Sequence, residues 1–459
     1  MVRDLGAIVK AYDVRGLVPD ELDAGIAREI GAAFAEVLGY PRAVVVGRDM
    51  RTSSPELAAA FTDGVIHRGV DVIDLGLTST DELYFASGWL DLPGAMITAS
   101  HNPPQYGGIK VCRAGAAPIS RETGLEEIRA RAERALARRG QPDGAGGGRR
   151  LGTVRRRDVL PDYAAYLRRL VDVSPTRRLK VVVDAGNGMA GLTVPAVFAD
   201  LQVELVPLFF ELDGTFPHHD ANPIKPENLR HLQATVRETG ADVGLAFDGD
   251  ADRCWFVDEH GRSVSPSTIT ALIAVRELAR EPGATIVHNL ITSRSVPEIV
   301  REHGGVPVRE RVGHSFIKAT MARTGAIFGG EHSAHFYFRD FWRADSGLLA
   351  ALHVLAALGS QDRPLSELLS AYERYVHSGE INSVVEDQAS TLARIKDAFV
   401  RRGGIKIDEL DGLTVEHDSW WFNVRASNTE PVLRLNAEGT DRPTMERIRD
   451  EVLDMVRAG

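Results

Sequence analysis

Residues 43–76, AVVVGRDMRTSSPELAAAFTDGVIHRGVDVIDLG, contain a short β-branched run, a polar turn, a helical stretch and a second apolar run. Two later stretches repeat this pattern, KVVVDAGNGMAGLTVPAVFADLQVELVPL from Lys180 and TIVHNLITSRSVPEIVREHGGVPVRER from Thr285. Near-continuous Val and Ile runs that alternate with helices are typical of parallel strands covered on both faces. The sequence therefore predicts three tandem, related α/β domains with mixed, parallel-rich sheets, each containing a β-α-β unit.

The last part of the chain has a different pattern. It combines two expected helices, near residues 392–402 and at the end of the chain, with expected strands near residues 380–386, 413–415, 420–425 and 432–437. This order predicts a C-terminal α+β domain with antiparallel pairing. The Gly-rich stretch QPDGAGGGRR, residues 141–150, is typical of an interdomain linker. We predict four domains, with bounds at residues 1–145, 146–253, 254–366 and 367–459.

The composition narrows the class of protein. The 459 residues are 44% hydrophobic and 26% charged, which is ordinary for a globular protein. Lys and Arg number 54 against 64 Asp and Glu, and the net charge of −10 disfavours a nucleic-acid partner. Two cysteines are too few for a disulfide framework, and no run of about 18 uncharged apolar residues occurs. The sequence predicts a cytoplasmic protein with no membrane segment.

The first loop with chemical potential is Thr98-Ala99-Ser100-His101-Asn102-Pro103-Pro104, which follows an apolar run at residues 95–97. Ligands of open α/β sheets collect at the carboxyl ends of strands, and the two prolines prevent a helix from continuing. We therefore expect the Ser100 hydroxyl to be presented to a ligand. The alternative is a loop serine that hydrogen-bonds its own backbone.

The second loop is Asp248-Gly249-Asp250-Ala251-Asp252-Arg253. Three carboxylates at alternate positions repel one another, and a divalent cation that prefers oxygen ligands, such as magnesium, manganese or calcium, would neutralise them. Arg253 favours a metal that acts on a phosphoryl group, because a guanidinium supplies positive charge to the dianion. A solvated acidic turn is the alternative.

The third loop is Gly329-Gly330-Glu331-His332-Ser333-Ala334-His335. In extended backbone Glu331, Ser333 and His335 would face one way, as donors and acceptors suited to sugar hydroxyls. His332 would face the other way and is expected to be structural. A zinc site or a polar edge strand would also explain Glu and His at this spacing.

The fourth loop, Arg425-Ala426-Ser427-Asn428-Thr429-Glu430-Pro431, joins two expected strands of the last domain. A guanidinium, two hydroxyls, an amide and turn N–H groups together would form a cradle for a phosphate dianion. An ordinary polar turn is the alternative.

Two cations outside these loops could flank a transferring phosphoryl group. Arg15 occurs in Tyr12-Asp13-Val14-Arg15-Gly16, and Lys110 in Gly107-Gly108-Ile109-Lys110. Both could instead be surface charges whose aliphatic stems cover the core.

The motifs TASHNP, DGDADR, GEHSAH and RASNTEP, with YDVRG near the start and VGHSFIK at residues 312–318, together resemble those of the α-D-phosphohexomutase superfamily. Within it, the chain is most similar to the bacterial phosphomannomutase/phosphoglucomutase branch. The likeness spans almost the whole chain in the family's order. It implies four domains around a central cleft, three of them related α/β units and the last a smaller α+β domain.

The resemblance also implies roles for residues of this sequence. Ser100 would carry a phosphoryl group in the resting enzyme, and Mg²⁺ would be held by a phosphoserine oxygen together with Asp248, Asp250 and Asp252. Glu331 and Ser333 would read the ring hydroxyls, with the substrate's phosphate held by Arg425, Ser427, Asn428 and Thr429. The further positions that match the family's cleft are Tyr12, Arg15, His101, Lys110, Arg253, His314 and His335. Of these, we expect Lys110 to perform the acid/base work.

The implied activity is the interconversion of mannose 6-phosphate and mannose 1-phosphate through a hexose 1,6-bisphosphate that turns end for end, with activity on glucose phosphates as well. The alternatives are a phosphoglucomutase, a phosphoglucosamine mutase and a non-catalytic sugar-phosphate sensor. A serine hydrolase is disfavoured, because the adjacent side chains of Ser100 and His101 would not readily form a nucleophile-to-base hydrogen bond and no Gly-x-Ser-x-Gly elbow occurs. The expected partners are small hexose phosphates, and a monomer is expected, with a dimer as the alternative.

One departure concerns the choice of sugar. Dual-specificity relatives have a lysine after the first strand of the third domain, whereas this chain has Ile291 at about that place. Arg294, in the same run of residues 288–294, is a candidate substitute.

Overall fold

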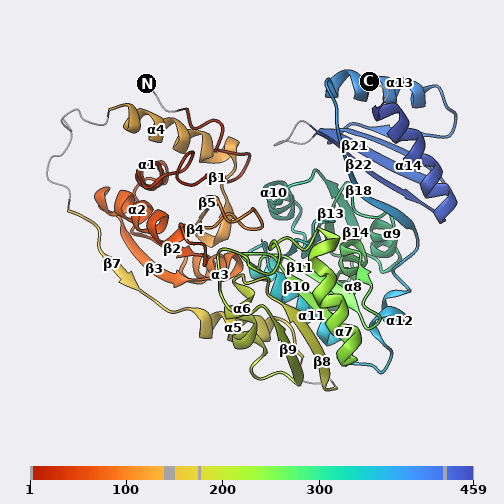
Figure 1. The fold of residues 1–459 in the computed structure, drawn as a ribbon, viewed down its shortest axis with the longest axis horizontal. Helices are drawn as coiled ribbons and strands as arrows, with labels where there is room; N and C mark the ends of the chain where they lie inside the picture. The colour runs from red at the N-terminus through yellow and green to blue at the C-terminus, as the bar shows by residue number, and fades with distance from the viewer. Residues whose placement is uncertain (1–3, 139–149, 174–176, 427–431, 458–459) are drawn as a thin grey trace. The chain divides into compact units, whose positions relative to one another are not determined.

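The computed structural model describes residues 4–138, 150–173, 177–426 and 432–457 (Figure 1). The chain forms two compact units. Unit 1 comprises Met1–Val264 and Ser333–Ser366, and unit 2 comprises Ser265–His332 and Glu367–Gly459. The predicted linker residues 141–149 lie outside the described residues.

The first sheet of unit 1 has the strand order β1-β5-β4-β2-β3-β7, with β6 beside β5. Its strands are β1 (Val14–Leu17), β2 (Ala43–Arg48), β3 (Asp71–Leu77), β4 (Gly94–Ile97), β5 (Tyr106–Arg113), β6 (Ala117–Pro118) and β7 (Val154–Arg156). Strands β4, β2, β3 and β7 pair in parallel, whereas β5 is antiparallel to both β4 and β1. The sheet is therefore mixed, as predicted.

The helices associated with this sheet are α1 (Ala24–Val37), α2 (Ser54–His67), α3 (Thr80–Leu90) and α4 (Glu126–Ala137). One apolar core joins α1, α2 and α4 to the sheet through side chains such as Phe34, Phe61 and Ile128. Helix α3 begins at a capping box in which Ser79 and Glu82 satisfy each other's backbone N–H groups. This cap fixes the turn that follows β3.

The second sheet of unit 1 has the order β12-β11-β10-β8-β9. Its strands are β8 (Leu179–Asp184), β9 (Val203–Leu208), β10 (Val243–Phe247), β11 (Cys254–Asp258) and β12 (Ser263–Val264), and its helices are α5 (Leu160–Leu170), α6 (Ala190–Phe198) and α7 (Arg230–Thr239). Strand β10 is fully buried, parallel to β8 and antiparallel to β11. Unit 1 also contains the antiparallel pair β16 (Phe336–Phe338) and β17 (Ala344–Asp345), followed by the buried helix α11 (Gly347–Gly359).

Unit 2 begins with a third α/β arrangement. Its elements are α8 (Pro266–Arg280), β13 (Thr285–Asn289), α9 (Ser295–Glu302), β14 (Val306–Glu310), α10 (His314–Thr324) and β15 (Phe328–Gly330). Strand β13 pairs in parallel with both β14 and β15. The three predicted β-α-β units are thus β2-α2-β3, β8-α6-β9 and β13-α9-β14, and each pair of strands is parallel.

The chain continues through α12 (Leu365–Leu369) into a fully antiparallel sheet of order β18-β22-β21-β20-β19. Its elements are β18 (Val376–Val384), α13 (Gln388–Val400), β19 (Lys406–Asp408), β20 (Leu413–His417), β21 (Trp420–Ala426), β22 (Val432–Gly439) and α14 (Arg442–Arg457). Phe399 of α13 and Ile448 of α14 pack with Phe422 in one buried core. The predicted fold class, three α/β domains and a C-terminal α+β domain, is confirmed. Among the described residues, no helix combines the length and the apolar character needed to cross a membrane.

Candidate active site

Ser100 lies in the loop of residues 98–105, the serine loop, which joins the antiparallel strands β4 and β5. The residue is buried, and its Oγ donates to Asp248 Oδ2 at 3.0 Å. Its backbone N–H donates to Thr98 Oγ1 at 2.9 Å. The φ angle of Ser100 is +51°, a left-handed conformation that is uncommon for residues with a side chain and that recurs at functional sites. The loop therefore holds the hydroxyl towards an aspartate of another loop.

This backbone conformation predicts an unusual order of stability. We expect Ser100→Gly to be more stable than Ser100→Ala by about 1 kcal/mol, because alanine keeps the steric cost of positive φ and glycine does not. Thermal unfolding of the two variants measures the difference. The same two substitutions at Ser370, which does not have positive φ, should show the reverse order of stability. Glycine there only adds entropy to the unfolded chain. A more stable Ser100→Ala would contradict the assigned strain.

The expectation about adjacent side chains was wrong. Ser100 Oγ and His101 Nδ1 lie 3.1 Å apart. The left-handed turn at Ser100 brings the two neighbouring side chains to the same side, whereas adjacent side chains in extended backbone point to opposite sides. Burial, followed by the charges of Arg253, Arg15 and Lys110, lowers the pKa of His101 well below its ordinary value. His101 is therefore neutral beside the hydroxyl.

Asp248, Asp250 and Asp252 occupy the connection between β10 and β11. All three are buried, and one carboxylate oxygen of each lies within 4.8 Å of the others. Among the described residues, Oδ1 of Asp250 and Oδ1 of Asp252 are buried and accept no hydrogen bond. Buried acceptors are nearly always satisfied, so this set of oxygens fits a divalent cation such as Mg²⁺ better than it fits a solvated acidic turn.

Two cations contact these carboxylates. Lys110 Nζ donates to Asp250 Oδ2 at 2.6 Å and to Asp252 Oδ2 at 2.7 Å, and Arg253 Nε donates to Asp248 Oδ2 at 2.8 Å. Burial raises the pKa of Asp248 to about 6, and Arg253 only partly offsets this. For Asp250, burial is outweighed by the charge and hydrogen bond of Lys110, so its pKa lies below the ordinary range. Asp248 and Asp250 are thus largely ionised at neutral pH.

The protonation of Lys110 bears on its expected acid/base work. Burial opposes its charge, but Asp250 and Asp252 outweigh burial and raise the pKa of Lys110 above its ordinary value. The side chain is therefore an ammonium at neutral pH, which donates hydrogen bonds and protons and accepts none. Lys110 is buried against Asp250 and Asp252 and is not a surface charge.

Arg15 is also held at the serine loop. Its Nε donates to Asp13 Oδ2 at 2.7 Å, and its Nη1 donates to Ala99 O at 3.1 Å and to the side chain of Asn102. These contacts tie β1 to the loop that carries Ser100, so the guanidinium is a fixed positive charge near the hydroxyl.

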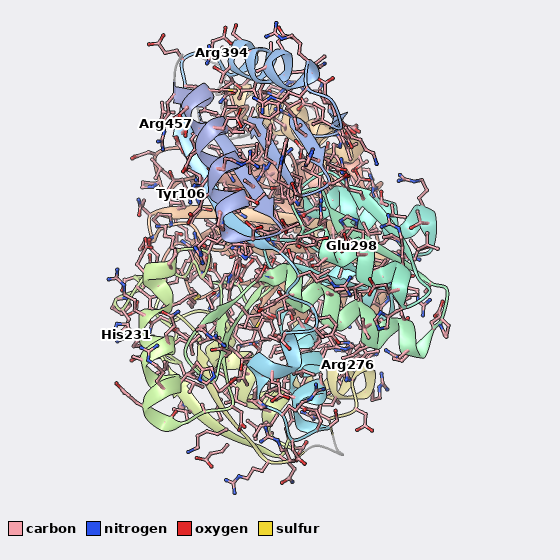
Figure 2. The ribbon with its side chains drawn as sticks, turned by 90° about the vertical axis from the view of Figure 1, so that its right-hand side faces the viewer. Tyr106, His231, Arg276, Glu298, Arg394 and Arg457 are labelled. Atoms are coloured by element: carbon pink, nitrogen blue, oxygen red, sulfur yellow. The ribbon has the colours of Figure 1, made fainter. Side chains whose placement is uncertain are left out.

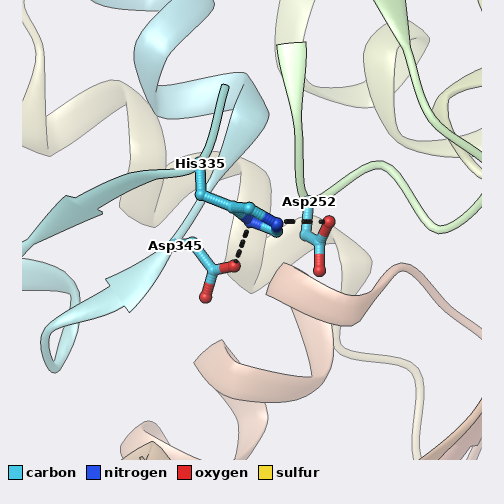
Figure 3. Close-up of side chains that lie close together, drawn as sticks. All are labelled: Asp252, His335 and Asp345. Carbon is cyan, nitrogen blue, oxygen red and sulfur yellow. Dashed lines mark hydrogen bonds and ion pairs between the residues drawn. The ribbon is translucent and has the colours of Figure 1, made fainter. Parts of the chain in front are cut away.

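His335 lies beside Asp252 of the acidic triad, as Figure 3 shows. Its Nδ1 is 2.8 Å from Asp345 Oδ2 and 4.0 Å from Asp252 Oδ1. Burial lowers the pKa of His335, but Asp252 and Asp345 outweigh burial and raise it above the ordinary value. Asp345, from β17, thus holds the His335 imidazole towards Asp252.

The expected extended backbone at residues 331–335 was wrong. The structure has a turn at residues 332–334, with φ of +64° at Ala334. The reason is local: the chain must leave β15 and enter β16 within five residues. In unit 2, Glu331 is buried, and its Oε2 accepts from Asn289 Nδ2 at 3.1 Å and from Gly313 N at 3.3 Å. In unit 1, Ser333 is half-buried.

Tyr12 and His314 are both half-buried in the structure. Tyr12 precedes β1, and His314 is the first residue of α10, directly after Gly313 with φ of +136°. His332, which the sequence predicts to be structural, lies 3.1 Å from Ser267 Oγ through its Nδ1.

Arg425 lies on β21 opposite Arg434 of β22. The carboxylate of Glu380, on β18, accepts hydrogen bonds from both guanidiniums: from Arg425 Nη2 at 3.0 Å and from Arg434 Nη1 at 3.2 Å. Glu380 thus holds the Arg425 guanidinium in place, and a guanidinium suits a phosphate dianion. The other predicted members of the cradle, Ser427, Asn428 and Thr429, lie outside the described residues.

We expect Arg425→Ala to lower kcat/KM on hexose phosphates by about 10- to 100-fold, mostly through KM, because a charge-assisted contact to phosphate is present before and during reaction. Steady-state kinetics of the purified variant measure this. The exposed Arg394 of α13 (Figure 2) provides the matched control, and Arg394→Ala should change neither constant. An unchanged KM in Arg425→Ala would remove Arg425 from the cradle.

Four family models match the chain in sequence order. They are the phosphoglucomutase/phosphomannomutase alpha/beta/alpha domains I, II and III, at residues 6–139, 161–261 and 265–375, and the C-terminal domain at residues 380–455. The chain belongs to the phosphoglucomutase/phosphomannomutase family.

Individual family members are similar over nearly the full length. A protein of Xanthomonas campestris named for phosphohexose mutases is 41% identical over 454 residues, with 98% of each chain covered. A phosphomannomutase of Escherichia coli K12 is 40% identical over 445 residues, with 95% of this chain and 96% of the relative covered. The solved structure of a family protein from Burkholderia thailandensis matches with a TM-score of 0.88 at 35% identity, with 98% and 97% covered.

Several residues that contact the predicted site residues were not identified from the sequence. Thr80 donates through Oγ1 to Asp250 Oδ2 at 2.6 Å, and Asp345 holds His335. Asn289 donates to Glu331, and Arg434 donates to Glu380, which also accepts from Arg425. Thr80 and Asn289 each lie at or just after the carboxyl end of a parallel strand, a position where polar residues could have been sought.

Proposed function

We propose that this protein is a phosphomannomutase that interconverts mannose 6-phosphate and mannose 1-phosphate and also acts on glucose phosphates. The observation that carries the proposal is the 3.0 Å contact between Ser100 Oγ and Asp248, one of three buried carboxylates that can hold a metal. Family membership and the phosphomannomutase name of the Escherichia coli relative support it.

The proposed cycle needs a phosphoserine at Ser100 and a hexose 1,6-bisphosphate. In the first transfer the bond from phosphorus to Ser100 Oγ breaks, a bond from phosphorus to a sugar oxygen forms, and the proton of the sugar hydroxyl balances the one that Ser100 regains. The bisphosphate then turns end for end, and its other phosphoryl group returns to Ser100. No proton or phosphoryl group is gained or lost overall.

We assign the acidic triad to Mg²⁺, which would neutralise charge on the transferring phosphoryl oxygens when bound. Lys110, Arg15 and Arg253 contribute fixed positive charge from the protein, and no reorganisation is needed at the moment of transfer. We assign the acid/base work to Lys110, whose ammonium would give up a proton in one transfer and regain it in the reverse transfer. The neutral His101 lies 3.1 Å from Ser100 Oγ, within hydrogen-bonding reach of the hydroxyl.

We assign Glu331 and Ser333 to the ring hydroxyls and Arg425 to the phosphate already on the sugar. Arg294 serves a different purpose from the missing lysine. Its guanidinium donates to the carbonyl oxygens of Asp418 and His417 at 2.9 and 3.0 Å within unit 2. Ile291 is buried and apolar, so the position offers no charge to a sugar.

The preference for mannose can be tested by measuring kcat/KM side by side on mannose, glucose and glucosamine 1-phosphates with Mg²⁺ and catalytic hexose 1,6-bisphosphate. We expect the highest value for mannose 1-phosphate and a measurable value for glucose 1-phosphate. A highest value for glucosamine 1-phosphate would replace the proposed substrate, and no turnover of any of them would overturn the proposed class.

We further propose that the protein acts in the cytoplasm, as a monomer, on small hexose phosphates alone. Support for the cytoplasm comes from the two cysteines, Cys112 and Cys254, which are both buried and form no disulfide with each other. Sedimentation of the purified protein tests the monomer.

A further inference from the structure

Arg51 follows β2, and its long side chain has no exposure to solvent. Charged side chains are rarely buried to this extent unless their hydrogen bonds are satisfied. Arg51 belongs to none of the four loops with assigned chemistry, so its burial calls for a separate explanation.

The guanidinium is satisfied almost entirely by the serine loop. Nη2 donates to Ser100 O at 2.7 Å and to Asn102 O at 2.6 Å. Nη1 donates to Pro103 O at 2.8 Å and to Tyr106 O at 3.2 Å. One planar group thus binds four carbonyls from residues 100–106, which are the end of the serine loop and the first residue of β5.

Arg51 is itself fixed from three sides. Its Nε lies 3.2 Å from Asp49 Oδ2, and Asp49 Oδ1 accepts from Ser54 Oγ at 2.5 Å. The ring of Phe216 lies over the guanidinium, with 5.0 Å from Cζ to the ring centroid. Gly214 packs so closely that a Cβ there would lie 2.4 Å from Arg51 Cα. The guanidinium has little freedom to move.

The loop that Arg51 holds is the one under strain. Ser100 has φ of +51°, and its carbonyl accepts from Arg51 and packs against Gly249, where an added Cβ would lie 2.4 Å from Ser100 O. A strained residue persists only where its surroundings over-determine it. The Ser100 carbonyl contact fixes the peptide that follows the hydroxyl-bearing residue, and with it the direction of the Ser100 side chain.

We propose that Arg51 is a positioning residue for phosphoryl transfer at Ser100: it sets the backbone of the serine loop so that Ser100 Oγ faces Asp248. The inference rests on the proposed function, because it concerns the rate of transfer to and from Ser100. Arg51 itself touches neither the reacting hydroxyl nor the three aspartates in any described contact.

Lysine cannot replace this arrangement, although it keeps the charge. An ammonium is a single point donor on a flexible stem, whereas the guanidinium presents a rigid fork to carbonyls on two sides. In Arg51→Lys we therefore expect the loop to relax and Ser100 Oγ to move.

The test uses the full-length protein with its phosphoryl group removed, and measures phosphorylation of Ser100 by hexose 1,6-bisphosphate in rapid-quench samples read by intact mass. For Arg51→Lys the maximal rate should fall by about 100-fold, the effect of misplacing a reacting group by about 1 Å. The bisphosphate concentration for half-maximal rate should change much less, because the residues assigned to binding are intact. If Arg51 had a merely structural role, its replacement would not lower the maximal rate while leaving the half-maximal bisphosphate concentration nearly unchanged.

Arg168 provides a matched control in unit 1, since its Nη1 also donates to two carbonyls, those of Ala196 at 2.8 Å and Val197 at 3.2 Å. Arg168→Lys should phosphorylate Ser100 at the wild-type rate. Phe216→Leu, which removes only the ring over Arg51, should slow phosphorylation less than Arg51→Lys does, and it tests the inference should Arg51→Lys fail to fold.

The outcomes separate the inference from the proposed function. If wild-type Ser100 takes up no phosphoryl group, the proposed function fails. If the wild type is phosphorylated and folded Arg51→Lys matches its maximal rate, or Phe216→Leu does so where Arg51→Lys does not fold, only the positioning role of Arg51 is overturned.

Discussion

Ser100→Ala is expected to lower kcat on mannose 1-phosphate by about 10⁴- to 10⁶-fold, the loss seen when a covalent nucleophile is removed. The reason is that the variant has no hydroxyl to accept or return the phosphoryl group. Asp248 loses one neutral donor but keeps Arg253, so the fold should persist. Intact mass of the wild type should change by one phosphoryl group on incubation with glucose 6-phosphate, and that of Ser100→Ala should not.

The exposed Ser370 supplies the control, and Ser370→Ala should retain both turnover and the change in mass. Two outcomes would contradict the assignment. Ser100→Ala that still gains a phosphoryl group would place the nucleophile on another residue. A wild-type chain that hexose 1,6-bisphosphate cannot charge would favour a sugar-phosphate sensor that has kept the fold.

The parts of the site that were predictable depend on local pattern. Apolar runs that are buried on both faces identify β4 and β10 as strands, and the polar loops that follow them carry Ser100 and the triad. Because ligands collect at the carboxyl ends of such strands, this pattern singled out both loops. The contact between Ser100 and Asp248 spans 148 positions, and the family resemblance, not the pattern, implied it.

The parts that were not predictable depend on backbone direction and on tertiary partners. No residue type in the serine loop requires a positive φ at Ser100, yet that angle brings His101 to the hydroxyl. The turn at residues 332–334 likewise replaced an expected extended segment. Arg51 and Asp345 support reacting groups from other elements, and a polar residue near a strand end does not by itself reveal which loop it will hold.

The second large effect is expected from Asp250→Asn, which should lower kcat by about 10²- to 10³-fold, comparable to the loss of one preorganised group that stabilises transition-state charge. Asparagine keeps the size of the side chain but presents a single neutral oxygen. It would also leave Lys110 and Thr80, which now donate to Asp250 Oδ2, with a weaker acceptor. Both changes weaken the set of oxygens that we assign to Mg²⁺.

The effect is measured by titrating the activity with Mg²⁺ and by calorimetry of Mg²⁺ binding. The apparent Mg²⁺ affinity of Asp250→Asn should fall together with kcat. Chelation should stop turnover by the wild type, and added Mg²⁺ should restore it. Asp162, exposed on α5, gives the same chemical change away from the triad, and Asp162→Asn should match the wild type in both quantities.

The pH dependence of Mg²⁺ binding provides an independent check on the same assignment. Three carboxylates lie beside two contacting cations, Lys110 and Arg253, and a bound metal would add positive charge to this set. Because burial raises the pKa of Asp248 to about 6, protons compete with the metal below that pH, and the apparent Mg²⁺ affinity should fall as the pH drops through 6. A rate that is undiminished without divalent metal at any pH would mean that Lys110 and Arg253 neutralise the transferring group alone, and the triad would then serve only to hold those two cations in place.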